Sequence, residues 1–408
     1  MKTCGLLGRK LGHSYSPAIH RQLADYSYSL FEVEPEDLEN FVKNAPYDGL
    51  NVTIPYKKEV LPFCDLLDPL AQELGSVNTL VRLGDGRLMG ANTDAWGFDQ
   101  MLGRVGVEVR GKKALVLGSG GACATVRTIL QKAGAEVVVI SRSGQDNYEN
   151  LHRHADAAMI VNTTPVGMYP NNGQSPVSLD LFPRLEAVLD LIYNPVRTRL
   201  CMEAEVLGIP WESGLYMLTA QAALASQYWT GTEISTEKLE AVWKTIGSSM
   251  ENIILIGMPG SGKSTVGNLL AQVLGRPFVD ADEEITKIIG SIPDFFSAQG
   301  EDAFRQVETQ VLSQLGSRSG LVLATGGGCV TREENYPLLH QNGTIIWLQR
   351  NLDLLPVDGR PVSQRDGVEA IYQKRKPRYC RFADQQVDNN GAAEETVAAI
   401  LRKLGGKP

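Results

Sequence analysis

The sequence predicts an α/β protein that contains more than one parallel β-sheet. Short apolar runs alternate with amphipathic stretches along most of the chain, which is typical of strands that alternate with helices. The two strongest signals are glycine-rich turns that each follow an apolar run and precede a helical pattern: GSGGA at 118–122 and GMPGSGKST at 257–265. We therefore expect two α/β halves, each built around one of these turns.

Length and composition agree with a multidomain globular protein. A chain of 408 residues exceeds one ordinary core, and 43% hydrophobic with 21% charged residues is typical of globular domains. The net charge of −8 does not favour nucleic acid as a partner, and no apolar run is long enough to cross a membrane. Because the six cysteines include no C-x-x-C pair, we expect free thiols, a reducing cytoplasm and no metal site built from protein ligands alone.

The first half shows strands and helices in alternation. Strands are expected in CGLLG, YSLFEV and GLNVTIP, helices in SPAIHRQLADY and PEDLENFVKN, and a hairpin over 77–89 that turns at 84–86. From residue 112 a strand, the GSGGA turn, a helix and the strand EVVVIS form a βαβ unit, which the strands AMIVNTT and AVLDLIY extend. Helices are expected over 215–229 and 236–246. Small residues then form a joint, and we place a linker at 247–251.

The second half opens with the strand NIILI and the pattern G-x-x-x-x-G-K-[ST]. Such a loop turns backbone N–H groups toward phosphate oxygens, and the helix that follows presents its positive end to them. We expect Lys263 at the β- and γ-phosphates of a nucleoside triphosphate and Ser264 at a bound Mg²⁺. The predicted phosphate-binding residues of the loop are Gly260, Ser261, Gly262, Lys263, Ser264 and Thr265. A glycine-serine turn before an ordinary helix is the alternative.

The GSGGA turn predicts a dinucleotide site, because it follows a strand and opens a helix. The predicted contacts are Gly118, Gly120, Gly121 and Ala122. NAD sites typically place an Asp or Glu at the end of the next strand, but this chain has Ser141-Arg142-Ser143 there. A guanidinium and two hydroxyls suit a 2′-phosphate, so the sequence favours NADP(H).

Polar residues also occur at three predicted element ends in the first 95 residues. The stretches are HSYSP before a helix, NVTIPYK after a strand and NTD before another helix. Taken singly, each has a structural alternative: Ser16 as a helix N-cap, Lys57 as a solvated surface lysine and Asp94 as a first-turn acid.

Eight stretches in the same order resemble shikimate dehydrogenases over residues 1–246: HSYSP, NVTIPYK, GSVNTL, GANTD, GSGGA, VNTTPVGM, DLIYNP and GLYMLTAQA. The resemblance implies a substrate-binding domain at 1–95, completed by helices over 215–246, and an NADP-binding Rossmann domain at 96–214. By position it implies these substrate-binding residues: Ser14, Ser16, Thr53, Lys57, Asn78, Asn92, Asp94, Tyr193 and Gln221. It also implies these NADP contacts: Ser141, Arg142, Ser143, Thr163 and Gly214. The family usually has Asn-Arg-Thr at 141–143, so this chain departs from it but keeps the arginine.

The same resemblance makes Lys57 and Asp94 the catalytic pair. Reduction of a ketone to an alcohol requires a hydride from the nicotinamide and a proton on the developing alkoxide. A lysine ammonium beside a carboxylate can stabilise that oxygen and deliver the proton.

Acidic and basic residues follow the loop of the second half. Asp280 and Asp282, in FVDAD, are expected on one side of a strand end, one near the nucleotide's metal and one near an acceptor hydroxyl. Arg305 and Glu308 are one helical turn apart, and an exposed ion pair is the alternative to a functional role. The glycines at 326–328 permit a close backbone approach to a ligand.

These residues lie in stretches that together resemble shikimate kinases from 252 to about 404: GMPGSGKST, DAD, GEDAFRQVE, ATGGG, DGRP and RKPRY. The resemblance implies a P-loop kinase domain at 252–408, like nucleoside monophosphate kinases, with these shikimate-binding residues: Asp282, Arg305, Gly327, Gly328 and Arg375. The loop residues 260–265 would bind ATP, Ser264 and Asp280 would hold Mg²⁺, and Asp282 would orient or deprotonate the attacking hydroxyl. Arg360 would also bind ATP, closing over it with a lid and neutralising charge on the transferring phosphoryl group as a catalytic residue. The chain has fewer residues before Arg360 than the family usually has, which leaves the lid's closing geometry open.

Together the two resemblances imply a bifunctional enzyme. It would reduce 3-dehydroshikimate to shikimate with NADPH and then phosphorylate the 3-hydroxyl of shikimate with ATP and Mg²⁺. A quinate-type dehydrogenase that uses NAD, fused to another small-acid kinase, is one alternative. A regulatory protein that binds nucleotides without catalysis is another. The sequence leaves the oligomeric state and any channelling between the halves open.

Overall fold

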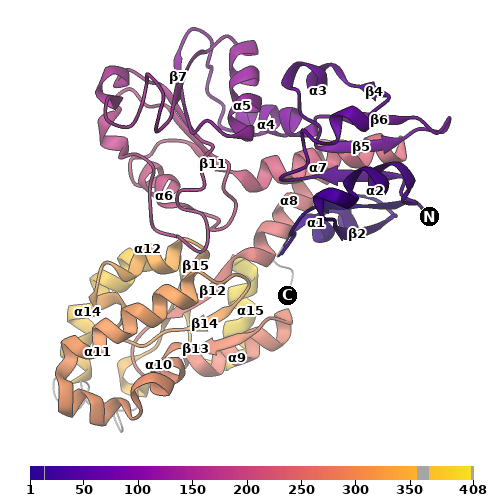
Figure 1. Ribbon diagram of the computed structural model, residues 1–408. Coiled ribbons are helices and arrows are strands. Elements are labelled where there is room, and N and C mark those ends of the chain that lie inside the picture. Colours follow the sequence, from indigo (N-terminus) through magenta and orange to yellow (C-terminus); the bar gives the residue numbers. More distant parts are fainter. Residues whose placement is uncertain (13, 356–366, 406–408) are drawn as a thin grey trace. The chain divides into compact units, whose positions relative to one another are not determined.

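The computed structural model describes residues 1–12, 14–355 and 367–405 (Figure 1). The chain forms two compact units. The first comprises Met1–Met168, Gln174–Tyr193 and Leu200–Gly247, and the second comprises Tyr169–Gly173, Asn194–Arg199 and Ser248–Pro408. The first unit contains two sheets and the second contains one.

The first sheet of unit 1 has the order β2-β1-β3-β5-β6-β4. Its strands are β1 (Thr3–Gly8), β2 (Ser27–Glu32), β3 (Gly49–Val52), β4 (Leu66–Leu67), β5 (Thr79–Arg82) and β6 (Leu88–Ala91). The predicted hairpin is confirmed, because β5 and β6 pair antiparallel. The accompanying helices are α1 (Ser16–Leu23), α2 (Leu38–Asn44), α3 (Pro69–Leu74) and α4 (Thr93–Arg104).

The second sheet of unit 1 is parallel throughout, in the order β11-β10-β9-β7-β8. Its elements are β7 (Lys113–Leu117), α5 (Gly121–Lys132), β8 (Glu136–Ile140), β9 (Met159–Asn162), β10 (Ala187–Asp190), α6 (Arg199–Val206) and β11 (Trp211–Ser213). The predicted βαβ unit is β7-α5-β8. Because β7 lies between β8 and β9, the strand order reverses there, and ligands of such sheets bind at the carboxyl ends beside that point.

Two helices close the first half, α7 (Gly214–Thr230) and α8 (Thr236–Met250). The indole of Trp229, on α7, packs under β3, where a Cβ added at Gly49 would lie 2.2 Å from the ring. The sequence predicted that the second helix ends at residue 246, followed by a linker over 247–251. The predicted end of that helix is wrong, because Gly247, Ser248 and Ser249 continue it to Met250. The division between the two compact units nevertheless falls between Gly247 and Ser248. Small residues weaken a helix but do not end it without a stop conformation.

The sheet of unit 2 is also parallel, in the order β13-β14-β12-β15-β16. Its strands are β12 (Asn252–Ile256), β13 (Phe278–Asp280), β14 (Val322–Ala324), β15 (Gly343–Gln349) and β16 (Gln385–Asp388). Its helices are α9 (Lys263–Leu274), α10 (Ala281–Ile289), α11 (Ile292–Gly316), α12 (Asn335–His340), α14 (Val368–Phe382) and α15 (Ala393–Lys403). Short 3₁₀ helices occur in both units, at Pro35–Asp37, Leu61–Phe63, Leu151–His154, Leu179–Leu181, Cys329–Thr331 and Leu352–Leu354.

The central strand of unit 2 is buried on both faces. Ile254 and Ile256 belong to a core with α11, α12 and α14, whereas Ile253 and Leu255 belong to a core with α9 and α15. This alternation explains why NIILI is a continuous apolar run, since side chains of a strand point to opposite faces in turn.

Four of the six cysteines are buried: Cys4, Cys123, Cys201 and Cys329. No helix within the described part of the chain is long and apolar enough to cross a membrane.

Candidate active sites

The first candidate site is organised around an ion pair between Lys57 and Asp94. Lys57 lies beyond the carboxyl end of β3, and Asp94 lies in the first turn of α4. The end of this strand and the start of this helix therefore bring the two side chains together. The Nζ–Oδ2 distance is 2.6 Å, and the side chains are 31% and 20% exposed. Lys57 is therefore paired, which the solvated-lysine alternative did not predict, and both groups remain open to a substrate.

A cluster of buried polar side chains includes Thr93, the residue directly before Asp94. The amide nitrogen of Asn78 donates to Thr93 Oγ1 at 3.0 Å and lies 3.5 Å from Gln221 Oε1, while Thr79 Oγ1 lies 3.0 Å from Thr93 Oγ1. All four side chains are less than 10% exposed. The structure thus unites two predicted substrate residues, Asn78 directly before β5 and Gln221 in α7. Reasoning from the sequence missed Thr79 and Thr93, although they lie in the GSVNTL and GANTD stretches.

The two serines lie at the start of α1. The Ser16 N–H donates to Ser14 Oγ at 3.2 Å, and Tyr15 is the N-cap residue without a side-chain cap bond. The alternative that Ser16 caps the helix is therefore wrong. The ring of Tyr15 meets Tyr193 edge-on at a centroid distance of 6.1 Å. This contact brings Tyr193, which follows β10, to the same region as the serines.

Two predicted substrate residues have structural contacts of their own. Asn92 is the N-cap of α4: its oxygen accepts from the Ala95 N–H at 3.2 Å, and its amide donates to the Ser76 carbonyl at 2.9 Å. The Thr53 N–H donates to the Leu7 carbonyl, and its side chain is half-buried. Asn92 is thus held in place whether or not it contacts a substrate, and its binding role stays a prediction.

The dinucleotide turn joins β7 to α5. Gly118 has a φ of 102°, which favours glycine. A Cβ added at Gly120 or Gly121 would meet no protein atom within 4 Å, so packing does not require glycine there. A ligand that came close to the backbone would require glycine there, and Gly120 is also the N-cap of α5. The residues therefore fit a dinucleotide pyrophosphate at the place the sequence predicted, with Ala122 in the first turn.

The other predicted NADP contacts fall into two groups. Ser141, Arg142 and Ser143 directly follow β8, and Arg142 and Ser143 are exposed. Thr163 and Gly214 have structural reasons for their identity. The Thr163 hydroxyl donates to the Leu117 carbonyl at 2.7 Å, and a Cβ at Gly214 would lie 2.0 Å from the Leu191 carbonyl oxygen.

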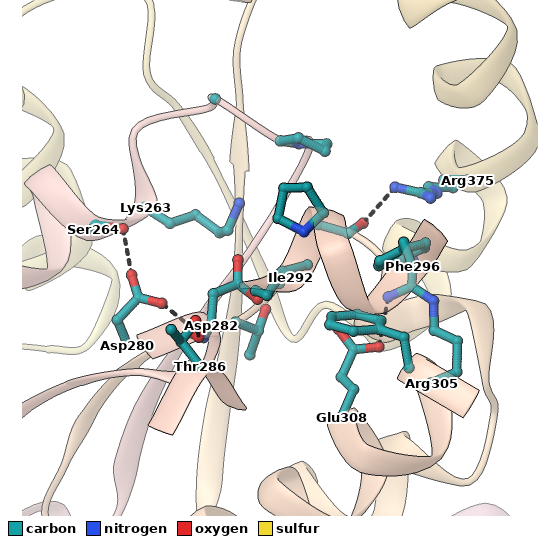
Figure 2. A pocket seen from close by; sticks show the side chains of 18 of the residues that line it. Lys263, Ser264, Asp280, Asp282, Thr286, Ile292, Phe296, Arg305, Glu308 and Arg375 are labelled. Carbon is teal, nitrogen blue, oxygen red and sulfur yellow. Dashed lines mark hydrogen bonds and ion pairs between the residues drawn. The ribbon is translucent and has the colours of Figure 1, made fainter. Parts of the chain in front are cut away.

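The second candidate site is a cavity of about 630 Å³ in unit 2 (Figure 2). It lies at the carboxyl ends of β12, β13 and β14, where the glycine loop, α10 and α11 meet. The predicted residues that line it are Gly260, Gly262, Lys263, Ser264, Thr265, Asp280, Asp282, Arg305, Gly327, Gly328 and Arg375.

The loop side of this cavity pairs Ser264 with Asp280. The Ser264 hydroxyl donates to Asp280 Oδ2 at 2.6 Å, and Asp280 Oδ1 accepts from the Asp282 N–H at 2.9 Å (Figure 2). The Lys263 ammonium donates to the carbonyls of Gly257 and Met258 at 3.1 and 3.0 Å. A hydroxyl hydrogen-bonded to a carboxylate at the end of a P-loop suits Mg²⁺, which prefers oxygen ligands and keeps contacts to phosphate. No cluster of three or more His, Cys, Asp or Glu side chains suited to a metal occurs among the described residues.

Asp282 lies in the first turn of α10, and the prediction that it lies on the strand is wrong. The strand β13 ends at Asp280, and the side chain of Asp280 caps α10, which begins at Ala281. Burial raises the pKa of the Asp282 carboxyl to about 6, against the opposing effect of the Lys263 ammonium. A carboxyl group with such a pKa can accept a proton near neutral pH.

Two arginines line the far side of the cavity. Arg305 Nη1 donates to Glu308 Oε2 at 2.7 Å, and Arg375 Nη1 donates to the Gly327 carbonyl at 3.0 Å (Figure 2). Both arginines are about 5% exposed and the Glu308 side chain is fully buried, so the exposed-pair alternative is wrong. A buried, oriented pair of guanidinium groups is suited to a carboxylate.

The glycines at 326–328 are needed by the site's own side chains. A Cβ at Gly328 would lie 2.1 Å from Arg305 Nη2, one at Gly327 2.6 Å from Pro259, and one at Gly326 2.7 Å from Asp282 Oδ1. They therefore let Arg305 and Asp282 approach the backbone. The remaining predicted residue of this site, Arg360, lies outside the described residues.

Comparison with known proteins gives the same two families. Residues 6–80 match the model of the shikimate dehydrogenase substrate-binding domain, and residues 259–405 match the model of shikimate kinase. A shikimate dehydrogenase (NADP(+)) from Clostridium perfringens is 34% identical over 268 residues, which cover 98% of that protein and 60% of this chain. One from Methanopyrus kandleri is 40% identical over 272 residues, or 93% of that protein and 58% of this chain.

The chain belongs to the shikimate dehydrogenase family. A solved shikimate 5-dehydrogenase from Thermus thermophilus, in complex with NADP(H) and shikimate, is 35% identical and has a TM-score of 0.55 to this chain. It covers 60% of this chain, and 99% of its own length is matched. The remaining part of the chain carries the shikimate kinase domain. This polypeptide thus joins a shikimate dehydrogenase to a shikimate kinase, as the motifs predicted.

Proposed function

We propose that the chain catalyses two consecutive reactions: the NADPH-dependent reduction of 3-dehydroshikimate to shikimate, and the Mg-ATP-dependent phosphorylation of the shikimate 3-hydroxyl. The observation that carries the proposal is the kinase cavity, where a P-loop and two buried arginines face one space. This combination suits a nucleoside triphosphate on one side and a small carboxylate on the other. The first half then supplies that carboxylate.

In the dehydrogenase half we assign catalysis to Lys57 and Asp94, which form the 2.6 Å ion pair. When bound, NADPH supplies the hydride. The Lys57 ammonium donates its proton to the ketone oxygen as charge develops there, and the Asp94 carboxylate orients it. The polar cluster beside Asp94 supplies amide and hydroxyl groups for the ring hydroxyls of the substrate. We assign the predicted Ser14, Ser16, Thr53 and Tyr193 to the same pocket.

In the kinase half the assignment follows the two sides of the cavity. Lys263 and the loop N–H groups bind the phosphates, and Ser264 with Asp280 holds the metal, which when bound screens the phosphate charges. Asp282 accepts or orients the proton of the attacking hydroxyl, and Arg305 with Arg375 holds the carboxylate. We also propose that residues 1–95 with 215–246 form the substrate domain, 96–214 the NADP domain and 252–408 the kinase domain. Buried thiols such as those of Cys4 and Cys329 support a reducing cytoplasm as the location.

The test supplies the purified chain with 3-dehydroshikimate, NADPH and Mg-ATP and follows shikimate 3-phosphate by mass spectrometry. We expect a product that carries one phosphate group per shikimate and no doubly phosphorylated product. Omission of ATP should leave shikimate, and omission of NADPH should leave 3-dehydroshikimate. The proposal fails if neither NADPH nor ATP is consumed.

We expect the chain to prefer NADPH because Arg142 follows β8, where a 2′-phosphate would lie. Changing Arg142→Ala should lower kcat/KM for NADPH by about tenfold or more and leave kcat/KM for NADH nearly unchanged, since a charge-assisted hydrogen bond is worth roughly 1.5–3 kcal/mol. Steady-state kinetics with both cofactors measures this. Arg153→Ala removes another exposed arginine of the same sheet region and should leave the ratio unaltered. Equal losses with both cofactors would contradict the assignment.

A further inference from the structure

The phosphate-binding loop is held by a residue that does not belong to its motif. Asn389 directly follows β16, and its amide nitrogen donates to the Ser261 carbonyl at 2.6 Å. The two residues are 128 positions apart in the chain. Among the described residues, Gly260 and Gly262 line the cavity, whereas Asn389 does not. Asn389 therefore contacts the loop and is not among the residues that line this cavity.

The orientation of the Asn389 amide is fixed by its neighbours. Its oxygen accepts from the Thr396 hydroxyl at 2.6 Å, and its backbone N–H donates to the Gln349 carbonyl at 2.7 Å. The side chains of Asn389 and Thr396 are 2% and 3% exposed. Because the hydroxyl donates to the oxygen, the amide nitrogen is the group left to face Ser261.

This bond determines which way one peptide group of the loop faces. In a trans peptide the carbonyl of one residue and the N–H of the next point in opposite directions. Since Asn389 binds the Ser261 carbonyl, the Gly262 N–H points away from Asn389. P-loops bind phosphate oxygens with such backbone N–H groups. The approach is close, because a Cβ at Gly262 would lie 2.7 Å from Asn389 Nδ2, and Gly262 has a φ of 88°.

We propose that Asn389 is a positioning residue for nucleotide binding: it holds the Ser261–Gly262 peptide so that the Gly262 N–H is available to a phosphate. The inference rests on the proposed kinase function. Asn389 acts through the loop and does not touch the reacting atoms. Thr396 supports it by orienting the amide.

The test uses the full chain and measures the Kd of Mg-ADP by calorimetry, together with KM for ATP and for shikimate. Asn389→Ala removes the bond and should raise the Kd of Mg-ADP and KM for ATP about tenfold, whereas KM for shikimate should change less than about twofold. Asn389→Asp has the same shape but places an acceptor against the Ser261 carbonyl, so we expect a larger rise than for alanine. Gln386→Glu adds the same charge on the exposed face of β16, where the side chain only accepts a hydrogen bond, and should bind Mg-ADP like the parent.

The outcomes separate this inference from the kinase assignment. A parent chain that neither binds Mg-ADP nor phosphorylates shikimate refutes the kinase function itself. A parent that does both, with Asn389→Asp binding Mg-ADP within about twofold of it, overturns only the role of Asn389. If the Asn389 variants lose shikimate binding as well, Thr396→Val tests the role of Asn389 instead, because it removes only the hydroxyl that orients the amide. A rise of about threefold in the Mg-ADP Kd with shikimate KM retained supports the role, and an unchanged Kd overturns it.

Discussion

Changing Lys57→Ala should lower kcat for the reduction of 3-dehydroshikimate by about 10²–10⁴-fold, the range that a positioned general acid contributes. The physical reason is that the ammonium at 2.6 Å from Asp94 is the proton donor of the proposed mechanism, and alanine leaves the developing alkoxide without one. Binding of NADPH should survive, because the cofactor turn lies on the other sheet of the unit. Stopped-flow or steady-state loss of NADPH fluorescence measures the rate, and titration of the same signal measures binding.

The chain offers a matched control for this variant. Lys58 is the next residue and is exposed, so Lys58→Ala removes the same charge and stem one position away from the ion pair. It should keep the parent rate. The kinase activity of the Lys57→Ala chain, measured with added shikimate, reports that the protein is intact. Unchanged turnover in Lys57→Ala, or equal losses in both lysine variants, would refute the catalytic role.

The second large effect is expected for Asp282→Asn, which should lower kinase kcat by about 10²–10⁴-fold because amide oxygen does not accept the hydroxyl proton as a carboxylate does. In the parent chain, kinase kcat/KM should rise with pH through a midpoint near pH 6 and level off above about pH 7, since the Asp282 carboxyl must be ionised and burial raises its pKa to about 6. The rate–pH profile measures this limb. Glu283→Gln, an exposed neighbour, should keep both the rate and the limb.

The raised pKa of the Asp282 carboxyl group also predicts how the stability of the folded chain changes with pH. Its pKa is higher in the folded chain than the ordinary value near 4, so the folded state binds the proton more tightly than the unfolded state. The stabilisation that this proton gives is complete below about pH 4 and is lost as the pH rises through about 6. At pH 8 the buried charge therefore costs stability. Asp282→Asn should unfold at an equal or higher temperature than the parent at pH 8, with the difference vanishing toward pH 4. A clearly lower Tm at pH 8 would show that the carboxylate is stabilised by its partners.

Much of both sites was predictable because it lies in short contiguous motifs. The P-loop, the dinucleotide turn and the two acids at the end of β13 and the start of α10 depend on glycine conformations and on residue spacings that one stretch of chain carries by itself. The prediction was weaker at the ends of helices, where the local sequence is compatible with more than one backbone structure. The helix expected to end at residue 246 continues through the small residues at 247–249 to Met250. Asp282, expected on a strand, lies in a helix that the side chain of Asp280 caps.

By itself, then, the sequence determined the two α/β halves, both nucleotide turns and the residue types that the two reactions need, because these follow from local backbone preferences and side-chain chemistry. Only the tertiary structure decided which distant side chains meet. Lys57 and Asp94 are 37 positions apart, Asn78 and Gln221 are 143 apart, and Ser261 and Asn389 are 128 apart. Such contacts depend on the order of strands in a sheet and on how helices pack against it. A linear pattern does not contain that order, since many topologies bury the same apolar residues.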